Sequence, residues 1–242
     1  MNKDYNGFEL KHITKEDIKN GSITLNAVEG EEKKLVMIQD EFRAGMDIVK
    51  DLPPSVTFYG SARLKEDHPE YIKAYKLAFR VAKELGYIII TGGGPGIMEA
   101  VNKGAKEAGV ESIGLTIRLP HEQDTNKYVT REASFHFFFA RQVCMSYTTE
   151  ACVFCAGGFG TLNELFEVLT IQQTGKVGKF PIILYGVEFW TPLKEIMKKF
   201  LHDKYELIGR EDTEIFTITD DEDEILEIIK NSRIRQGEDA LY

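Results

Sequence analysis

Short apolar runs alternate along the chain with longer stretches of helical spacing, starting after Pro53-Pro54. The apolar runs are rich in β-branched and aromatic side chains, which predicts strands. These strands are expected at residues 56–59, 87–91, 112–117, 151–155, 181–185 and 215–218. Helices are expected between them, near residues 69–85, 96–109, 135–148, 161–173, 190–202 and 221–231.

Several of the predicted strands are apolar at every position, as in Ile88-Ile89-Ile90. Strands read in this way when helices cover both faces of a parallel sheet. Strands and helices that alternate with short loops predict an α/β fold, a Rossmann-like doubly wound parallel sheet flanked by helices. Residues 51–242 are expected to form this single domain. Residues 1–50 are expected to form an N-terminal extension with a helix that packs on the core.

The charge balance argues against some partners. Asp and Glu total 39 against 30 for Lys and Arg, a formal charge of −9. Proteins that grip nucleic acid or anionic membranes usually carry the opposite excess, so neither is expected as a partner. No apolar stretch approaches the roughly 20 residues that cross a bilayer, and the N-terminus lacks the pattern of a secretory signal. A cytoplasmic protein is expected.

The cysteines predict no disulfide framework. There are three, Cys144, Cys152 and Cys155, and they lie close together in the sequence. Cys152 and Cys155 share a predicted strand and point to opposite faces of it. Buried free thiols are therefore expected. The five histidines are scattered and suggest neither a metal site nor a Ser-His-Asp arrangement.

Three loops that follow predicted strands are rich in small residues: Gly60-Ser61-Ala62-Arg63, Thr91–Gly96 and Ala156–Thr161. Ligands of doubly wound sheets bind beyond the carboxyl ends of the strands, so all three loops fall on the relevant edge. Glycine amides followed by a helix N-terminus suit a phosphate group. Neither a Walker loop nor a dinucleotide fingerprint is present. The alternative for the last loop is a tight strand-to-helix turn with Thr161 as N-cap.

In the second loop, the consecutive glycines of Thr91–Gly96 indicate that something approaches the backbone closely. A ligand and a neighbouring segment are equally compatible with them. Pro95 suits the first turn of the helix that follows.

Two charged residues near the last loop are candidates for chemistry. Leu162, Leu165, Phe166 and Leu169 form an apolar stripe, which leaves Glu164 and Glu167 off that stripe. Thr161-x-x-Glu164 has the spacing of a capping box, and spacing alone favours a cap for Glu164 over a chemical task. Arg141 lies in an aromatic run, where it either stacks on the surface or recognises a phosphate or carboxylate.

Taken together, these segments resemble the Lonely Guy family, many members of which are labelled "lysine decarboxylase-like". The resemblance covers roughly residues 40–200. It rests on Phe58–Arg63, Thr91–Ala100 and Gly157–Glu164, and the segment 119–123 and the phenylalanine-rich run ending in Arg141 look like the longer bacterial branch. Lysine decarboxylase activity itself is not expected, since no pyridoxal-phosphate lysine context is recognisable.

The resemblance implies a Rossmann-like hydrolase that splits nucleoside 5′-monophosphates, such as AMP or N6-modified AMP, into free base and ribose 5-phosphate. Arg141 and Glu164 match the catalytic residues of the family. It further implies a homodimer or higher oligomer with the site near the interface, and no metal, flavin or nicotinamide cofactor. The residues implied in substrate binding are Gly60, Ser61, Gly93, Gly94, Glu122, Gly157, Gly158, Gly160, Thr161 and Glu167, with the phosphate on Gly157, Gly158, Gly160 and Thr161.

The chain departs from the family pattern at three positions. Ala156 replaces the usual proline, Gln142 replaces a lysine, and Asn163 stands where a glutamate is common. The change at Gln142 removes a positive charge expected beside the site. Two alternatives therefore remain: a nucleotide or phosphoribosyl sensor or carrier without catalysis, and a structural oligomer with a vestigial phosphate site.

Overall fold

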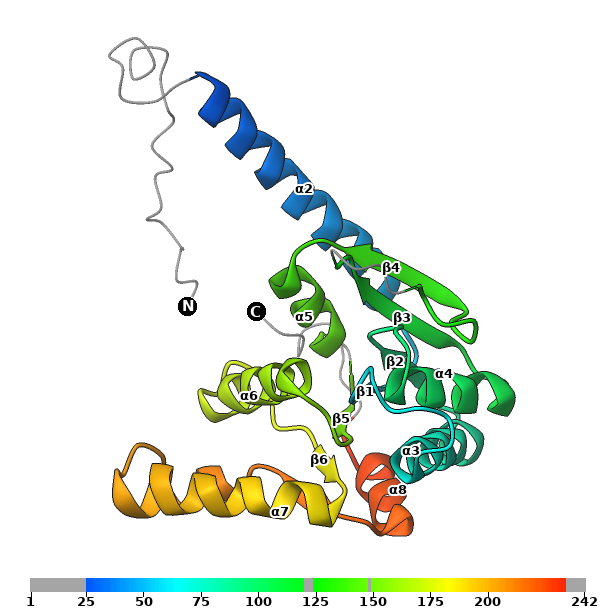
Figure 1. Ribbon diagram of the computed structural model, residues 1–242, viewed down its shortest axis with the longest axis vertical. Coiled ribbons are helices and arrows are strands. Elements are labelled where there is room, and N and C mark those ends of the chain that lie inside the picture. Colours follow the sequence, from blue (N-terminus) through cyan, green and yellow to red (C-terminus); the bar gives the residue numbers. More distant parts are fainter. Residues whose placement is uncertain (1–24, 120–123, 148, 234–242) are drawn as a thin grey trace, which may run out of the picture. The chain divides into compact units, whose positions relative to one another are not determined.

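One parallel sheet organises the protein, as the sequence predicts. The computed structural model describes residues 25–119, 124–147 and 149–233. In these residues seven strands pair in the order β4-β3-β2-β1-β5-β6-β7 (Figure 1). The strands are β1 Ser55–Tyr59, β2 Ile88–Thr91, β3 Ser112–Ile117, β4 Arg131–Phe135, β5 Ala151–Phe154, β6 Ile182–Tyr185 and β7 Thr217–Thr219. The order reverses between β1 and β5, which is where doubly wound sheets bind their ligands.

Helices cover both faces of this sheet. The helices of the described residues are α2 Leu25–Val49, α3 Pro69–Arg80, the π-helical η1 Val81–Leu85, α4 Ile97–Ala108, α5 Phe138–Ser146, α6 Phe159–Gln173, α7 Val187–Ile196, the π-helical η2 Met197–Lys204, the 3-10 turn η3 Glu211–Glu214 and α8 Glu222–Lys230. Helices α3, α4 and α8 lie together on one side of the sheet (Figure 1). Their side chains pack on one face of the sheet, and those of α5, α6 and α7 pack on the other. Successive strand residues alternate between the two layers: Phe58 faces α3 and α4, and Tyr59 faces α5 and α6. No helix among the described residues combines the length and the hydropathy that crossing a bilayer requires.

The six predicted strands are all present, but the sequence pattern missed β4. A helix was expected over residues 135–148, whereas the chain forms the strand Arg131–Phe135 first and the helix Phe138–Ser146 afterwards. Only Ala133 and Phe135 of this strand are buried, because β4 lies at the edge of the sheet. Its backbone pairing with β3 therefore stabilises a segment whose side chains read as polar.

A carboxylate from α2 holds the start of α5. The chain divides into two compact units, Met1–Asp40 and Glu41–Tyr242, so Glu41 belongs with the sheet. The Glu41 carboxylate accepts hydrogen bonds from the backbone N–H groups of His136 (2.8 Å) and Phe137 (3.2 Å). A negative charge at a helix N-terminus stabilises the helix, and α5 carries Arg141. The expected domain boundary after residue 50 stays a prediction.

The three cysteines are buried and lie outside any disulfide, and Cys152 and Cys155 face opposite layers, as predicted. Burial raises the pKa of both Cys144 and Cys155 to about 12. Since the thiolate is the reactive form, we expect no cysteine to react with Ellman's reagent in the native protein at pH 8. All three should react after unfolding in guanidinium. A thiol that reacts within seconds in the native protein would contradict this expectation.

Candidate functional site

A cavity of about 680 Å³ lies at the carboxyl edge of the sheet, on the α5 and α6 side of the point where the strand order reverses. The loops after β1 and β2, the end of β3, α5 and the start of α6 form its walls. Its lining residues are Gly60, Ser61, Ala62, Arg63, Gly92, Gly93, Gly94, Met98, Thr116, Ile117, Leu119, Phe138, Arg141, Gly158, Phe159, Gly160, Thr161, Leu162 and Glu164. The glycine loops that the sequence singled out thus share one cavity.

Most of the residues expected at the site line this cavity. They are Gly60, Ser61, Gly93, Gly94, Arg141, Gly158, Gly160, Thr161 and Glu164. Gly157 lines an adjoining cavity instead. Glu167 lies half-buried one turn further along α6, and Glu122 lies outside the described residues. Thr116 and Ile117 were missed, although they end a predicted strand and the same reasoning places strand ends at the site.

The Arg141 and Glu164 side chains meet between α5 and α6. Arg141 Nη1 lies 3.4 Å from Glu164 Oε1, and the two side chains are only 9% and 14% exposed. The Arg141 Nε–H donates to the carbonyl oxygen of Leu115 at 2.7 Å, which fixes the plane of the guanidinium. A Cβ atom at Gly92 would overlap Arg141 Nη2, so glycine at that position makes room for the arginine. Arg141 is therefore a buried, oriented cation rather than a surface residue.

Burial changes the proton affinity of Glu164. It raises the pKa of this carboxyl to about 7; the positive charge of Arg141 lowers the pKa and the charge of Glu167 raises it further. Burial also raises the pKa of Glu167. Glu164 consequently gains and loses a proton near neutral pH, a property that is frequent in groups that catalyse proton transfer.

The capping box expected at Thr161 is not formed. Helix α6 begins at Phe159, its N-cap is Gly158, and no side chain caps it. Thr161 is the third helical residue and is buried, so Glu164 lies in the second turn and pairs with Arg141. The helix therefore begins two residues before Thr161, with Gly160 in its first turn. These uncapped amides at the cavity wall are suited to an anion.

The buried stripe of α6 also differs from the expected one. Thr161, Leu165, Val168 and Ile171 are buried, while Phe166 is 40% exposed. The stripe is thus rotated toward Glu164. This rotation places the carboxylate at the edge of the packed face instead of in solvent.

Neighbouring segments of the chain account for part of the second glycine loop. Gly93 has a φ of +69°, and a Cβ atom there would come within 2.7 Å of Thr116 Cγ2. The loop therefore packs closely against the end of β3 on one side and lines the cavity on the other. Pro95 lies outside the helix that follows, since α4 begins at Ile97 with Gly96 as N-cap, so the expected place of Pro95 in the first helical turn is wrong.

Two of the departures from the family pattern contact each other. The Gln142 side-chain amide donates to Asn163 Oδ1 at 2.6 Å, joining α5 to α6 at an exposed position. Neither residue lines the cavity. The change at Gln142 is thus matched by a polar neighbour that carries no charge.

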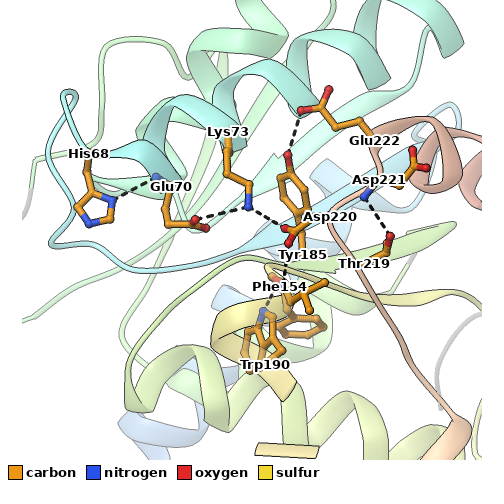
Figure 2. A network of polar contacts seen from close by, with 11 residues as sticks. His68, Glu70, Lys73, Phe154, Tyr185, Trp190, Thr219, Asp220, Asp221 and Glu222 are labelled. Atoms are coloured by element: carbon orange, nitrogen blue, oxygen red, sulfur yellow. Dashed lines mark hydrogen bonds and ion pairs between the residues drawn. The ribbon is translucent and has the colours of Figure 1, made fainter. Parts of the chain in front are cut away.

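A second cavity, of about 760 Å³, lies beside the first and shares Ser61 with it. Figure 2 shows Lys73 between Glu70 and Asp220, at 3.5 and 2.8 Å. The same ammonium lies 4.7 Å from the centre of the Tyr185 ring. The single ammonium offsets one of the two negative charges and ties α3 to the segment after β7. They act as a structural network.

The model of the family described as "Possible lysine decarboxylase" matches residues 98–229, more than half of the chain. An uncharacterized protein of Archaeoglobus fulgidus is 32% identical over 126 residues, which are 50% of this chain and 81% of that protein. The "Probable cytokinin riboside 5'-monophosphate phosphoribohydrolase LOG6" of Arabidopsis thaliana is 31% identical over 116 residues, 46% of this chain and 57% of LOG6. The chain thus matches little more than half of the LOG6 length.

Solved structures share the fold. The molybdenum cofactor binding protein of Rippkaea orientalis superposes with a TM-score of 0.55 over 74% of this chain and 97% of that one, at 21% identity. Likeness at this level concerns the fold alone. Because the family model covers more than half of the sequence, the chain belongs to the "Possible lysine decarboxylase" family, the family of the Lonely Guy proteins.

Proposed function

We propose that this chain hydrolyses the N-glycosidic bond of nucleoside 5′-monophosphates, with AMP or N6-modified AMP as the substrate class. The observation that carries the proposal is the buried Arg141–Glu164 pair in the cavity that the glycine loops surround. The sequence similarity to LOG6 supports the same class of reaction. The products are the free base and ribose 5-phosphate.

The cavity suits a nucleotide in size and in the placing of its donors. Its volume of about 680 Å³ is in the range of roughly 300–1,000 Å³ typical of small-molecule sites. The 5′-phosphate binds at the uncapped N-terminus of α6, on the amides of Gly160 and Thr161. The nucleoside then extends from this helix toward the loops after β1 and β2.

The two charged side chains have distinct roles in this reaction. The bond between C1′ and the base nitrogen breaks, its electron pair leaves with the base, and positive charge develops on the ribosyl carbon. The Glu164 carboxylate stabilises that charge and takes a proton from the water that attacks C1′; the base takes up a proton as it leaves. Arg141 holds the carboxylate in place, and its positive charge lowers the pKa of Glu164 and so favours the ionised form.

The pH dependence follows from the pKa of Glu164. Since burial raises this pKa to about 7, the carboxyl is protonated and inactive below that value. We expect kcat/KM for AMP to rise with pH, about tenfold per unit below pH 6, and to level off above about 7.5. The substrate phosphate titrates separately, near pH 6. A profile that stays flat between pH 5 and 9 would contradict the assigned role.

The direct test is to incubate the purified chain with AMP, GMP, CMP, UMP and N6-substituted AMP and to follow free base by chromatography. Release of base together with ribose 5-phosphate is the expected result. Bound nucleotide without any release would overturn the hydrolase.

That outcome would select the second candidate function, a carrier or sensor that binds a nucleotide or phosphoribosyl ligand without turnover. The observation that favours it is the shared fold with the molybdenum cofactor binding protein. Calorimetric binding of AMP with no products after a long incubation distinguishes it from the hydrolase.

We also propose that the protein is a homodimer with the site near the subunit interface. Apolar side chains border the cavity: Phe159 is 93% exposed and Phe138 is half exposed, and both line it. Exposed apolar surface of this kind favours association. Sedimentation that gives a monomer at micromolar concentration would contradict this proposal.

A further inference from the structure

Asn126 is buried behind the second glycine loop and binds it at several points. Its backbone N–H donates to the Gly93 carbonyl at 2.9 Å. Its side-chain Nδ2 lies 3.0 Å from the Gly93 carbonyl oxygen and 2.9 Å from that of Gly94. Asn126 is 8% exposed and does not line the cavity. Asn126 therefore holds the loop from the side opposite the cavity.

The orientation of the Asn126 amide is fixed by its other contacts. The Tyr128 N–H donates to Asn126 Oδ1 at 3.1 Å, so the oxygen faces Tyr128 and the nitrogen faces the loop. Asn126 Nδ2 also lies 2.9 Å from Asn102 Oδ1. Asn102 in turn accepts from the Thr91 hydroxyl at 2.7 Å and donates to Ser112 Oγ at 2.7 Å. A buried network in which each member has partners holds one geometry.

This grip determines where the loop's own donors point. In a trans peptide the carbonyl and the next N–H point in opposite directions. With the Gly93 carbonyl held by Asn126, the Gly94 N–H points away from Asn126, toward the cavity that Gly94 lines. Gly94 is buried, and among the described residues none accepts a hydrogen bond from its N–H. A buried N–H usually has a partner, and a ligand in the cavity would supply one.

The Gly94 N–H and the proposed phosphate-binding position at the start of α6 lie at the ends of different strands. β2 and β5 lie on either side of β1, so the ends of these two strands are about 10 Å apart. A phosphate bound at the start of α6 therefore lies on the far side of β1 from the loop that carries Gly94. The part of a nucleotide within reach of Gly94 is the sugar.

We propose that Asn126 is a positioning residue that, together with Asn102, aims the Gly94 N–H at a ribose hydroxyl oxygen of the bound nucleotide. The identity of the ligand as a nucleotide rests on the proposed function, whereas the geometry of the loop is independent of that function. Loss of the Asn126 side chain would remove the hydrogen bonds from Nδ2 to the Gly93 and Gly94 carbonyls and leave only the backbone N–H of residue 126 on the Gly93 carbonyl. The Gly93–Gly94 peptide would then be held less firmly, and its N–H would be aimed less well at the sugar.

The sequence allows a selective measurement. Gly-Gly pairs occur only at Gly92-Gly93, Gly93-Gly94 and Gly157-Gly158. Protein labelled with [1-¹³C,¹⁵N]glycine therefore gives HNCO signals for three amides only: Gly93, Gly94 and Gly158. Spectra are recorded for the full chain without ligand, with inorganic phosphate and with AMP. The same set is recorded for Asn126→Ala and for the control Asn231→Ala, at an exposed position in the turn after α8.

In the wild type, phosphate should move the Gly158 signal and leave Gly94 in place, and AMP should move both. In Asn126→Ala, the Gly93 and Gly94 signals should already differ without ligand, AMP should move Gly94 less than in the wild type, and phosphate should still move Gly158. If AMP is hydrolysed, KM should rise about tenfold in this variant, the effect of one lost hydrogen bond, with a smaller change in kcat. Asn231→Ala should behave as the wild type.

Some results would overturn the proposal. A Gly94 signal that moves with phosphate alone would assign this donor to the phosphate. An unchanged response of Gly94 to AMP in Asn126→Ala would show that Asn126 does not aim it. If Asn126→Ala fails to fold, the wild-type comparison of phosphate with AMP still decides where Gly94 donates. If neither ligand moves Gly158, the proposed function fails, while the ligand-free spectra still test the grip of Asn126.

Discussion

Replacing Glu164 with glutamine is expected to lower kcat/KM for AMP about a thousandfold, the effect typical of losing an acid–base group together with its charge. Glutamine has nearly the same shape and keeps an oxygen for Arg141 Nη1, which lies 3.4 Å from the carboxylate. It cannot ionise, so it neither stabilises a positive ribosyl carbon nor accepts a proton from water. Base release at pH 8, followed by chromatography, measures the effect.

The same substitution should stabilise the fold above neutral pH. The pKa of Glu164 is raised from 4.5 to about 7, so the folded protein binds more protons than the unfolded chain between these values. The free energy of unfolding of the wild type therefore falls as pH rises through this window, by about 1 kcal/mol per unit. The glutamine side chain does not titrate, so the variant lacks this loss. Urea unfolding at pH 5 and pH 8 should show the variant gaining on the wild type by roughly 2–3 kcal/mol.

A matched control separates these effects from a general change of charge. Glu195 is an exposed carboxylate on α7, away from the cavity. Glu195→Gln removes one negative charge, as Glu164→Gln does, and should leave base release unchanged. Full activity of Glu164→Gln would refute the assignment of the catalytic carboxylate.

Local patterns predict this fold well because most of its strands are buried on both faces. Ile88-Ile89-Ile90 reads as a strand without any knowledge of its neighbours, and the alternation of elements determines a parallel sheet. The sequence pattern did not predict β4, because about half of its side chains are exposed and it is stabilised by pairing with β3. Such pairing joins segments that are distant in sequence, so no local pattern reports it.

In the candidate site, too, the sequence predicts what local patterns determine and misses what distant contacts determine. The glycine loops are visible in sequence because each lies between a strand and a helix, and parallel strands bring their ends to one edge. The local pattern Thr161-x-x-Glu164 suggested a cap, but α6 begins at Phe159, and Glu164 pairs with the arginine that α5 supplies. No local sequence pattern identifies Asn126, because its hydrogen-bond partners lie in the loop after β2 and in α4.

The pairing of Arg141 with Glu164 leads to the second large effect, that of Arg141→Met. Methionine keeps most of the volume but loses the ion pair and the hydrogen bond from Nε to Leu115. Arg141 lowers the pKa of Glu164, so its removal should raise that pKa above 7. At pH 7 we expect kcat/KM to fall at least about a hundredfold, part from protonation of the carboxyl and part from its lost orientation. The rise of kcat/KM with pH should move to higher pH, and activity should partly return near pH 9.

The free energy of unfolding of Arg141→Met should also fall as pH rises. This loss of stability tests the electrostatic cause without any substrate. Removing one partner of a buried ion pair destabilises a protein by about 3–5 kcal/mol when the other partner stays charged. Glu164 escapes this penalty by taking up a proton, so the loss in Arg141→Met should be small at pH 5 and large at pH 9. In a Glu164→Gln background the loss should be smaller at pH 9 and independent of pH, because no carboxylate is left unpaired. Urea unfolding of the four proteins at both pH values measures this coupling. Equal losses at pH 5 and 9 in the presence of Glu164 would mean that Arg141 acts through packing and its bond to Leu115, and not through the charge of the carboxylate.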